Sequence, residues 1–516
     1  MKVFEMIELS FFGEILANNY ANIDLYGEFE RQGKKTKVHG FYDGDGKYLL
    51  RFLPKEVGVY RYVVYGLFSQ EGEIEVEPND SCLYIKAVDT HFEDGNGKIY
   101  FPFGTTVYGL IHQEESLIEE TFETLKNSPF NKIRFCLFPK HYAFNENEPQ
   151  FYPFKKKDPS KPIKDNHDVY SPDLGYWHHL EKWLSRLGEL GIEADIILFH
   201  PYDRWGYNEL SQKENLAYLN YVCARLSAFP HVWWSLANEY DLCLKRKSVK
   251  DFLEIEEYLS SIDSFHHLLS IHNCFHPYDY ARPNITHVSI QTKDLSDVHN
   301  LLSDFSKPVI VDECCYEGDL PAYWGCISAS EMTYRFARCL SSGAYCSHGE
   351  TYLDEHDVLW WAKGGKLKGD SPARIAFLRS IMEEIGKPLL PIPSSLAGFA
   401  NMSEQEKEAA LKSIPAEFRH YPKGIFLMDK MEARRFFDSE YEYHSHTKDD
   451  SAFFMFLDRR TCRYLDMDLP EGKTYQVELL DVYNMSRTTL LEKASGHTRV
   501  SFSPKEGLAI LAKQIY

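Results

Sequence analysis

The 516-residue chain lacks the features of membrane-spanning, exported and disulfide-stabilised proteins. No segment approaches the roughly 18 consecutive apolar residues that a membrane-spanning helix needs. The opening residues, MKVFEMIELSFFGEIL, carry three glutamates and no basic stretch leading into an apolar run, so we expect no signal peptide. The 11 cysteines are odd in number and include no CxxC pair, which indicates reduced thiols. These absences predict a cytoplasmic protein.

Basic residues are also scarce, with 57 Lys and Arg against 77 Asp and Glu, for a net charge of −20. Nucleic acids need a concentrated basic face, and anionic membrane surfaces attract basic segments. We therefore expect neither nucleic acid nor membrane as a partner. Aromatic residues are abundant, at 15% of the chain, and their rings serve both core packing and the binding of partly apolar ligands such as sugars.

The two ends of the chain are typical of β domains. Residues 1–88 alternate apolar and polar side chains, clearest in Tyr48–Phe52 and Val59–Tyr65, with Gly/Asp-rich turns between the runs. Residues 400–516 begin with a polar helix, Ser403–Lys412, and return to the same alternation. The clearest strands there are 451–457, 475–481 and 497–502. We predict a β-sandwich at each end.

Residues 89–395 are different, because short apolar strands alternate with amphipathic helices. The strands are predicted at 100–107, 132–138, 192–199, 232–236, 268–271, 287–290, 308–311 and 344–347, and helices at 117–126, 175–190, 214–228, 249–262 and 330–340. Eight strand-helix units predict an α/β fold closed into a (β/α)8 barrel. The largest insertion, Pro139–Leu174, follows the second strand.

Active sites of such barrels lie at the carboxyl ends of the strands, and two predicted strands end in carboxylates. The fourth runs from His231 through Asn238 to Glu239, and the seventh runs from Lys307 to Glu313. We expect Glu239 and Glu313 to face each other across the barrel mouth. Glycoside cleavage needs such a pair, one to protonate the leaving oxygen and one to attack the anomeric carbon.

The surroundings of the two carboxylates should decide which one acts as the acid and which one as the nucleophile. A separation of about 5–5.5 Å favours retention of configuration. Burial and a neighbouring negative charge raise the pKa of the acid, while hydrogen bonds keep the nucleophile ionised. The sequence therefore predicts a retaining glycoside hydrolase.

The Asn-Glu after strand four and the Glu that ends strand seven resemble clan A of the glycoside hydrolases, which includes cellulase-like members. The resemblance implies Glu239 as acid/base, Glu313 as nucleophile and Asn238 as the partner of the sugar 2-hydroxyl. It also implies a place near the nucleophile for Arg134, and a fixed cation lowers the pKa of a carboxylate.

More of the chain is similar to bacterial proteins in which a β-sandwich precedes a cellulase-like or apiosidase-like barrel and a β domain follows. The likeness is carried by Val38–Gly44, Arg51–Pro54, Ser347–Tyr352 and Trp360–Gly365. Many such barrels are secreted, so a cytoplasmic member implies an imported oligosaccharide or small glycoside. We expect exo-action on this β-linked substrate, and the sequence leaves the sugar open.

Further polar and aromatic residues near strand ends are candidates for substrate binding: Tyr108, His200, His272, Gln291, His348, Glu350 and Trp361. His348 and Glu350 depart from the clan pattern, because many members end strand eight with a Trp. Since they lie two apart, they share one face of an extended strand. Trp360 or Trp361 is expected to replace the missing ring.

Two other functions stay open. A metal-dependent hydrolase would draw on His348, Glu350, Asp354, His356 and Asp357, although the first strand lacks the usual His-X-His. A carbohydrate-binding barrel without activity would have lost a carboxylate, and both are present. We expect no cofactor and no catalytic metal. A homo-oligomer is also open, because an added β domain can mediate dimers.

Overall fold

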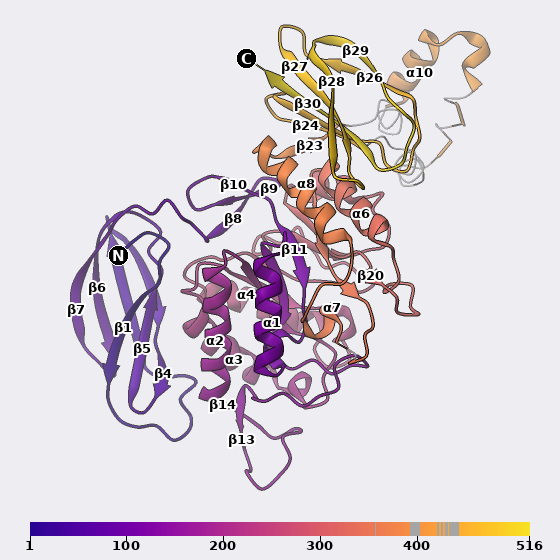
Figure 1. Cartoon of the computed structure of the whole chain (residues 1–516). Helices are drawn as coiled ribbons and strands as arrows, with labels where there is room; N and C mark the ends of the chain where they lie inside the picture. The colour runs from indigo at the N-terminus through magenta and orange to yellow at the C-terminus, as the bar shows by residue number, and fades with distance from the viewer. Residues whose placement is uncertain are drawn as a thin grey trace. The chain divides into compact units, whose positions relative to one another are not determined.

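The computed structural model describes residues 1–356, 358–392, 403–420, 423–424, 427–428, 432 and 443–515 (Figure 1). The chain divides into two compact units. The first contains Met1–Gln291, Lys307–Ile327 and Ser347–Gly369, and the second contains Thr292–Ser306, Ser328–Cys346 and Asp370–Tyr516. Each unit is described separately below.

Strands near the N-terminus form two antiparallel sheets that share one core. One sheet has the order β1-β5-β4, and the other has the order β3-β2-β6-β7. Their bounds are β1 Ile7–Phe12, β2 Leu25–Arg31, β3 Lys34–His39, β4 Phe41–Gly44, β5 Lys47–Phe52, β6 Gly58–Gly66 and β7 Gln70–Val76. Phe29 of β2 stacks on Phe52 of β5, with ring centroids 4.0 Å apart, so the sheets pack face to face. The predicted sandwich is confirmed.

The barrel is an eight-stranded sheet in the order β17-β16-β15-β12-β11-β21-β19-β18. The strands are β11 Phe103–Thr106, β12 Lys132–Cys136, β15 Glu193–Phe199, β16 Val232–Ala237, β17 Leu269–Ser270, β18 Val288–Gln291, β19 Val309–Glu313 and β21 Tyr345–His348. Every one overlaps a predicted strand. A single parallel bridge between His272 and Ser289 joins the two ends of the sheet. The prediction of a (β/α)8 barrel is confirmed.

The helices between these strands largely match their predicted positions. They are α1 Glu115–Lys126, α2 Leu174–Glu189, α3 Gln212–Leu226, α4 Val249–Ile262 and α6 Ala329–Ser341. Ser211 and Glu214 form a capping box at the start of α3, which fixes where that helix begins. Three helices were not predicted: α5 Val298–Phe305, α7 Trp360–Lys363 and α8 Ser371–Ile385. α5 and α7 are short, and the amphipathic pattern of a short helix is weak.

Short elements complete the first unit. A hairpin sheet in the order β10-β9-β8 precedes the barrel, and the insertion after β12 contains the pair β13-β14. A parallel pair, β20-β22, follows β19 and β21. Their bounds are β8 Ile85–Val88, β9 His91–Asp94, β10 Ile99–Tyr100, β13 Phe154–Lys156, β14 His167–Pro172, β20 Glu317–Gly318 and β22 Glu350–Thr351, with 3₁₀ helices η1 Leu110–His112, η2 Tyr207–Glu209 and η3 Tyr240–Leu242.

The second unit contains the C-terminal β region. One antiparallel sheet has the order β23-β24-β25-β30-β27-β28, and β26 pairs with β29. The elements are β23 Leu389–Pro391, α10 Glu404–Ser413, η4 Ala416–Phe418, β24 Tyr443–Thr447, β25 Ala452–Phe456, β26 Tyr464–Leu469, β27 Thr474–Asp481, β28 Ser486–Ala494, β29 Gly496–Ser501 and β30 Leu508–Ile515. Buried side chains from both sheets, including Phe453, Met467 and Ile510, form one core. This confirms the second predicted β domain and its preceding helix.

Candidate active site

Two buried glutamates lie at the carboxyl ends of barrel strands. Glu239 follows β16 directly after Asn238, and Glu313 is the last residue of β19. Their exposed fractions are 6% and 9%. Glu239 has a φ of 49°, in the left-handed region that side chains other than glycine rarely adopt. The strained backbone turns the chain out of the strand at this point, where the 3₁₀ helix η3 begins.

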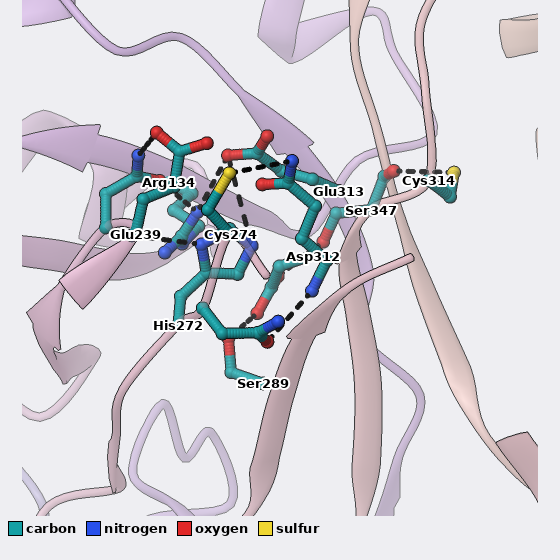
Figure 2. Close-up of polar contacts among 12 residues, drawn as sticks. Arg134, Glu239, His272, Cys274, Ser289, Asp312, Glu313, Cys314 and Ser347 are labelled. Carbon is teal, nitrogen blue, oxygen red and sulfur yellow. Dashed lines mark hydrogen bonds and ion pairs between the residues drawn. The ribbon is translucent and has the colours of Figure 1, made fainter. Parts of the chain in front are cut away.

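A single amide connects the two carboxylates. With its nitrogen facing them, the orientation that satisfies its hydrogen bonds, Gln291 donates to Glu239 Oε1 at 3.2 Å and to Glu313 Oε2 at 3.1 Å. Laid end to end, these two distances place the two oxygens no more than 6.3 Å apart. The two side chains therefore belong to one compartment, and Figure 2 shows them in one cluster with Arg134 and His272.

Glu313 accepts a hydrogen bond from one side chain and lies near two further nitrogen atoms, and these three come from other strands or strand ends. The hydroxyl of Tyr108, just after β11, donates to Glu313 Oε1. Arg134 Nη1 on β12 lies 3.7 Å from the same oxygen, and His272 Nε2 lies 3.9 Å from it. Arg134 also donates to Asn238 Oδ1 at 3.0 Å, so it links the two strand ends that carry the glutamates. Glu313 Oε1 is thus held by one hydrogen bond and one buried cation, with the His272 imidazole close by.

Glu239 has a different set of partners. The hydroxyl of Tyr202, after β15, donates to Glu239 Oε2, and the Asn238 amide donates to the same oxygen at 3.2 Å. The backbone N–H of Glu239 donates to His272 Nδ1 at 3.4 Å. This leaves the proton of a neutral imidazole on His272 Nε2, which faces Glu313. Burial, followed by the charge of Arg134, lowers the pKa of His272 and keeps the ring neutral.

A polar layer inside the barrel supports Arg134 and Glu313 from below. Lys132 Nζ lies 2.6 Å from Asp195 and 2.9 Å from Asp312. Ser289 and Ser347 donate to Asp312 at 2.6 Å and 2.8 Å. Although burial disfavours its ionised form, the charges of Lys132 and Arg134 hold the pKa of Asp312 well below its ordinary value. Every charge of this layer is paired, as burial requires.

The insertion after β12 brings a lysine and aromatic rings to the carboxylates. Lys140 is 2% exposed, and its Nζ lies 3.3 Å from the ring centre of Tyr108 and 4.3 Å from that of Tyr202. Trp361 of α7 packs edge-on against Tyr108 and Tyr142, with ring centres 5.9 Å and 5.0 Å apart. Burial lowers the pKa of Lys140, against the opposing charges of Glu239 and Glu313. The candidate site is therefore narrow, aromatic and weakly cationic on this side.

The pKa of Glu313 differs from the sequence expectation, which was that hydrogen bonds keep the nucleophile ionised. Burial and then the charge of Glu239 raise the pKa of Glu313 to about 7, although Arg134, Lys140 and the Tyr108 hydroxyl act against this. Two carboxylates this close titrate as a pair and keep one proton between them up to near-neutral pH. The hydrogen bonds to Glu313 limit this rise and do not cancel it.

Six of the nine predicted substrate-binding residues join the carboxylate pair, and three have other neighbours. Those near the pair are Asn238, Arg134, Tyr108, His272, Gln291 and Trp361. His200 is buried and its Nε2 lies 3.1 Å from the Phe138 carbonyl oxygen. His348 and Glu350 belong to a separate buried cluster with Glu317. Since Ser347 points to Asp312 inside the barrel, the next residue of the strand faces the other way.

Sequence reasoning missed several side chains of the site. Tyr202 lies two residues beyond the predicted candidate His200, and Lys140 lies just beyond the second strand. Either could have been found by following a strand end a few residues further. Asp312 precedes Glu313 and lies inside the barrel, where it accepts hydrogen bonds from Ser289 and Ser347. Cys274 also adjoins Glu239, and burial and the charge of Glu239 raise the pKa of its thiol.

Comparisons with known proteins agree with this architecture. A family model described as the catalytic domain of apiosidase-like proteins matches residues 87–384, and two domain families of unknown function match residues 1–66 and 441–512. No curated protein matches the chain.

Two solved structures are similar over most of the chain. A Bacteroides vulgatus ATCC 8482 protein, provisionally assigned as a glycoside hydrolase, is 30% identical with a TM-score of 0.83, over 100% of this chain and 99% of that one. A family 5 glycoside hydrolase of the same organism is 13% identical with a TM-score of 0.59, over 83% of this chain and 93% of that one. The second likeness concerns the fold alone.

The barrel, the paired carboxylates at its mouth and these matches define a glycoside hydrolase. Within that class, the chain belongs to the family with an apiosidase-like catalytic domain. Among the described residues, no helix is both long and apolar enough to span a membrane.

Proposed function

We propose that the protein hydrolyses a β-linked glycoside by double displacement with retention, using Glu239 as acid/base and Glu313 as nucleophile. The observation that carries this proposal is the Gln291 amide shared by both carboxylates, which limits the distance between the two oxygens to 6.3 Å. Inverting enzymes hold their carboxyl groups about 6.5–9.5 Å apart to admit a water molecule, whereas retaining enzymes need about 5–5.5 Å. The upper limit of 6.3 Å on the distance between Glu239 Oε1 and Glu313 Oε2 favours retention.

In the first step, a Glu313 oxygen attacks the anomeric carbon while Glu239 gives its proton to the departing glycosidic oxygen. The C–O bond to the leaving group breaks, and a glycosyl ester forms on Glu313. In the second step, Glu239 takes a proton from water, whose oxygen attacks the same carbon and releases Glu313. The donors Tyr108 and Arg134 hold Glu313 Oε1 and orient the carboxylate for attack.

The reactive form needs one proton on the pair, located on Glu239 when Glu313 attacks. The raised pKa of Glu313, about 7, supplies that single proton over the neutral range. Tyr202 and Asn238 both donate to Glu239 Oε2, whereas Gln291 alone is described as donating to Oε1, so we place the acid proton on Oε1. The shared Gln291 amide then keeps both oxygens aligned with the scissile bond.

For the substrate, we propose a small glycoside with a pentose such as apiose, cleaved by exo-action. The apiosidase-like family match supports the sugar class. The near-complete burial of both glutamates, at 6% and 9% exposed, supports a small pocket that takes a terminal sugar.

The test is hydrolysis of 4-nitrophenyl β-glycosides of apiose, arabinose, xylose, glucose, galactose and mannose. Glu239→Gln should lower kcat by about 10²–10⁴-fold, because water attack on the glycosyl ester loses its general base even though nitrophenolate leaves without an acid, and Glu313→Gln should abolish turnover. Glu209→Gln, at an exposed glutamate that pairs with Arg246, serves as the matched control and should retain wild-type rates. Full activity in either site variant would refute the assignment, and no hydrolysis of any glycoside by the wild type would favour a binding protein.

We further propose a cytoplasmic location, three domains, 1–88, 89–395 and 400–516, and a carbohydrate ligand rather than nucleic acid or membrane. Buried reduced thiols such as Cys136, Cys223 and Cys339 support a reducing compartment. The three family matches, at 1–66, 87–384 and 441–512, support the division into domains. Limited proteolysis and cell fractionation test these points.

A further inference from the structure

A second buried cluster of ionisable side chains lies outside the carboxylate pair. It consists of Glu317 on β20, His348 at the end of β21 and Glu350 on β22, at most 1% exposed. One imidazole nitrogen and one oxygen from each carboxylate all lie within 4.8 Å of one another. The parallel pairing of Glu317 with Glu350 across β20 and β22 fixes the two carboxylates side by side.

The charges of this cluster need compensation. Two adjacent carboxylates in a buried site repel each other and lose their hydration, so they require a proton, a basic side chain or a metal ion. Glu350 has no basic side chain within ion-pair distance among the described residues; its two oxygens accept backbone N–H groups of Lys368 and Gly369 at 2.7 Å and 2.8 Å. Amide dipoles stabilise the charge of Glu350 without neutralising it, and the Tyr352 hydroxyl donates to Glu317 Oε1 at 3.3 Å.

The imidazole gives an independent indication of a ligand. His348 is fully buried, and its Nε2 has no hydrogen-bond partner. Its Nδ1 lies 3.2 Å from Thr105 Oγ1, which itself accepts a hydrogen bond from Trp360 Nε1 at 2.8 Å. With the ring proton on Nδ1 donated to Thr105, Nε2 presents a lone pair. Metal-bound histidines are commonly held in this way by a second partner.

The backbone near the cluster is also shaped for close approach. A Cβ added to Gly369 would lie 2.4 Å from Glu317 Oε1, so only glycine lets this carboxylate approach the chain at that point.

We propose that Glu317, His348 and Glu350 bind one divalent transition-metal ion, Zn²⁺ or Mn²⁺, as a structural site separate from catalysis. Two carboxylate oxygens and one imidazole nitrogen are a donor set suited to these ions, and the imidazole disfavours Ca²⁺ and Mg²⁺. Ligand atoms about 2.1 Å from a tetrahedral ion lie about 3.4 Å from one another, so the three ligand atoms, now within 4.8 Å of one another, need to close by up to about 1.4 Å. The ion ties β20 to β21 and β22 and neutralises both carboxylates.

Of the other residues that the sequence grouped with this site, His356 and Asp354 are directed elsewhere. The His356 side chain is 75% exposed, and Asp354 pairs with Lys368 at 2.9 Å. Asp357 lies outside the described residues. The ligand set is therefore three residues from three short strands and not the loop cluster that the sequence suggested.

The test uses the full-length protein without a histidine tag, stripped with EDTA and titrated by calorimetry with Zn²⁺, Mn²⁺ or Ca²⁺ alone. We expect one equivalent of Zn²⁺ or Mn²⁺ per chain, weaker binding of Ca²⁺, and a Tm that falls on stripping and returns on adding the metal. Glu350→Gln should raise the Kd by at least about tenfold. Glu355→Gln, an exposed neighbour, should leave it unchanged.

Several results would overturn the proposal. If the stripped wild type takes up neither Zn²⁺ nor Mn²⁺ and EDTA leaves its Tm unchanged, the two carboxylates share a proton instead. Equal metal binding by wild type and Glu350→Gln would place the ion elsewhere. If the Glu350→Gln protein fails to fold, the metal titration and the Tm of the wild type still decide the proposal.

Discussion

Replacing Glu313 by Gln should stabilise the protein at alkaline pH while abolishing its activity. Burial and the charge of Glu239 raise the pKa of Glu313 from 4.5 to about 7. The folded chain therefore keeps this proton up to about pH 7, whereas the unfolded chain loses it above pH 4.5. Unfolding releases a proton in that window, so stability falls as the pH rises through it. Above about pH 7 Glu313 is ionised in both states, and the loss of folding stability has reached its full size.

The pKa difference sets the size of this effect. From 4.5 to about 7 it corresponds to about 3 kcal/mol at 25 °C. Glutamine keeps the shape of the protonated acid and does not ionise, so Glu313→Gln should be more stable than wild type by about 3 kcal/mol at pH 8. The difference should shrink as the pH approaches 4.5.

The assay is urea unfolding of both proteins at several pH values between 5 and 8, followed by tryptophan fluorescence. Glu355→Gln is the control, because it also removes one negative charge from a side chain that is 86% exposed. It should show no such pH-dependent gain. A Glu313→Gln protein that is no more stable than wild type at pH 8, or that gains equally at pH 5, would refute the reasoning.

The remaining predictions concern catalysis. Because the pair loses its single proton above about pH 7, kcat/KM should fall above that pH. Lys140→Met should move this alkaline limb to higher pH, because Lys140 lowers the pKa of Glu313, and an unmoved limb would contradict the assignment. Tyr202→Phe removes a donor to Glu239 and should lower kcat about 10–100-fold for poor leaving groups, as loss of a charged hydrogen bond of about 1.5–3 kcal/mol does. Activated aryl leaving groups should be less affected, and an equal loss on both kinds of substrate would argue against a role at Glu239.

The barrel and its carboxylate pair could be predicted because they depend on regular patterns. Runs such as Val232–Ala237 and Val309–Glu313 are buried throughout, as strands of a covered parallel sheet are. A carboxylate at the carboxyl end of such a strand lies at the barrel mouth. For the same reason Tyr108 and Gln291, which lie at strand ends, were expected at the site and contact the pair.

Residues carried by irregular segments were not predictable in the same way. Lys140 approaches Tyr108 and Tyr202 because of the path of the long insertion after β12, which no periodicity specifies. His348 and Glu350 were expected to share a face, and they do meet in one cluster. Which face that is depends on the register of β21, and the contact of Ser347 with Asp312 places Ser347 inside the barrel and His348 on the other face.

The raised pKa of Glu313 also depends on three-dimensional positions that the sequence pattern does not specify. Hydrogen bonds and the charge of Arg134 were expected to keep Glu313 ionised, and the structure has both, with Tyr108 as the hydrogen-bond donor. What the sequence does not give is how deeply Glu313 is buried, at 9% exposed, or how near Glu239 lies. Those two quantities decide the direction of the pKa change.

The most direct measurement is to trap the glycosyl-enzyme with a 2-deoxy-2-fluoro glycoside of the best sugar in the panel, carrying a dinitrophenyl leaving group. The account predicts one adduct per chain, located by peptide mass spectrometry on Glu313, and a first product of retained anomeric configuration by NMR. An adduct on another residue, or a product of inverted configuration, would contradict it.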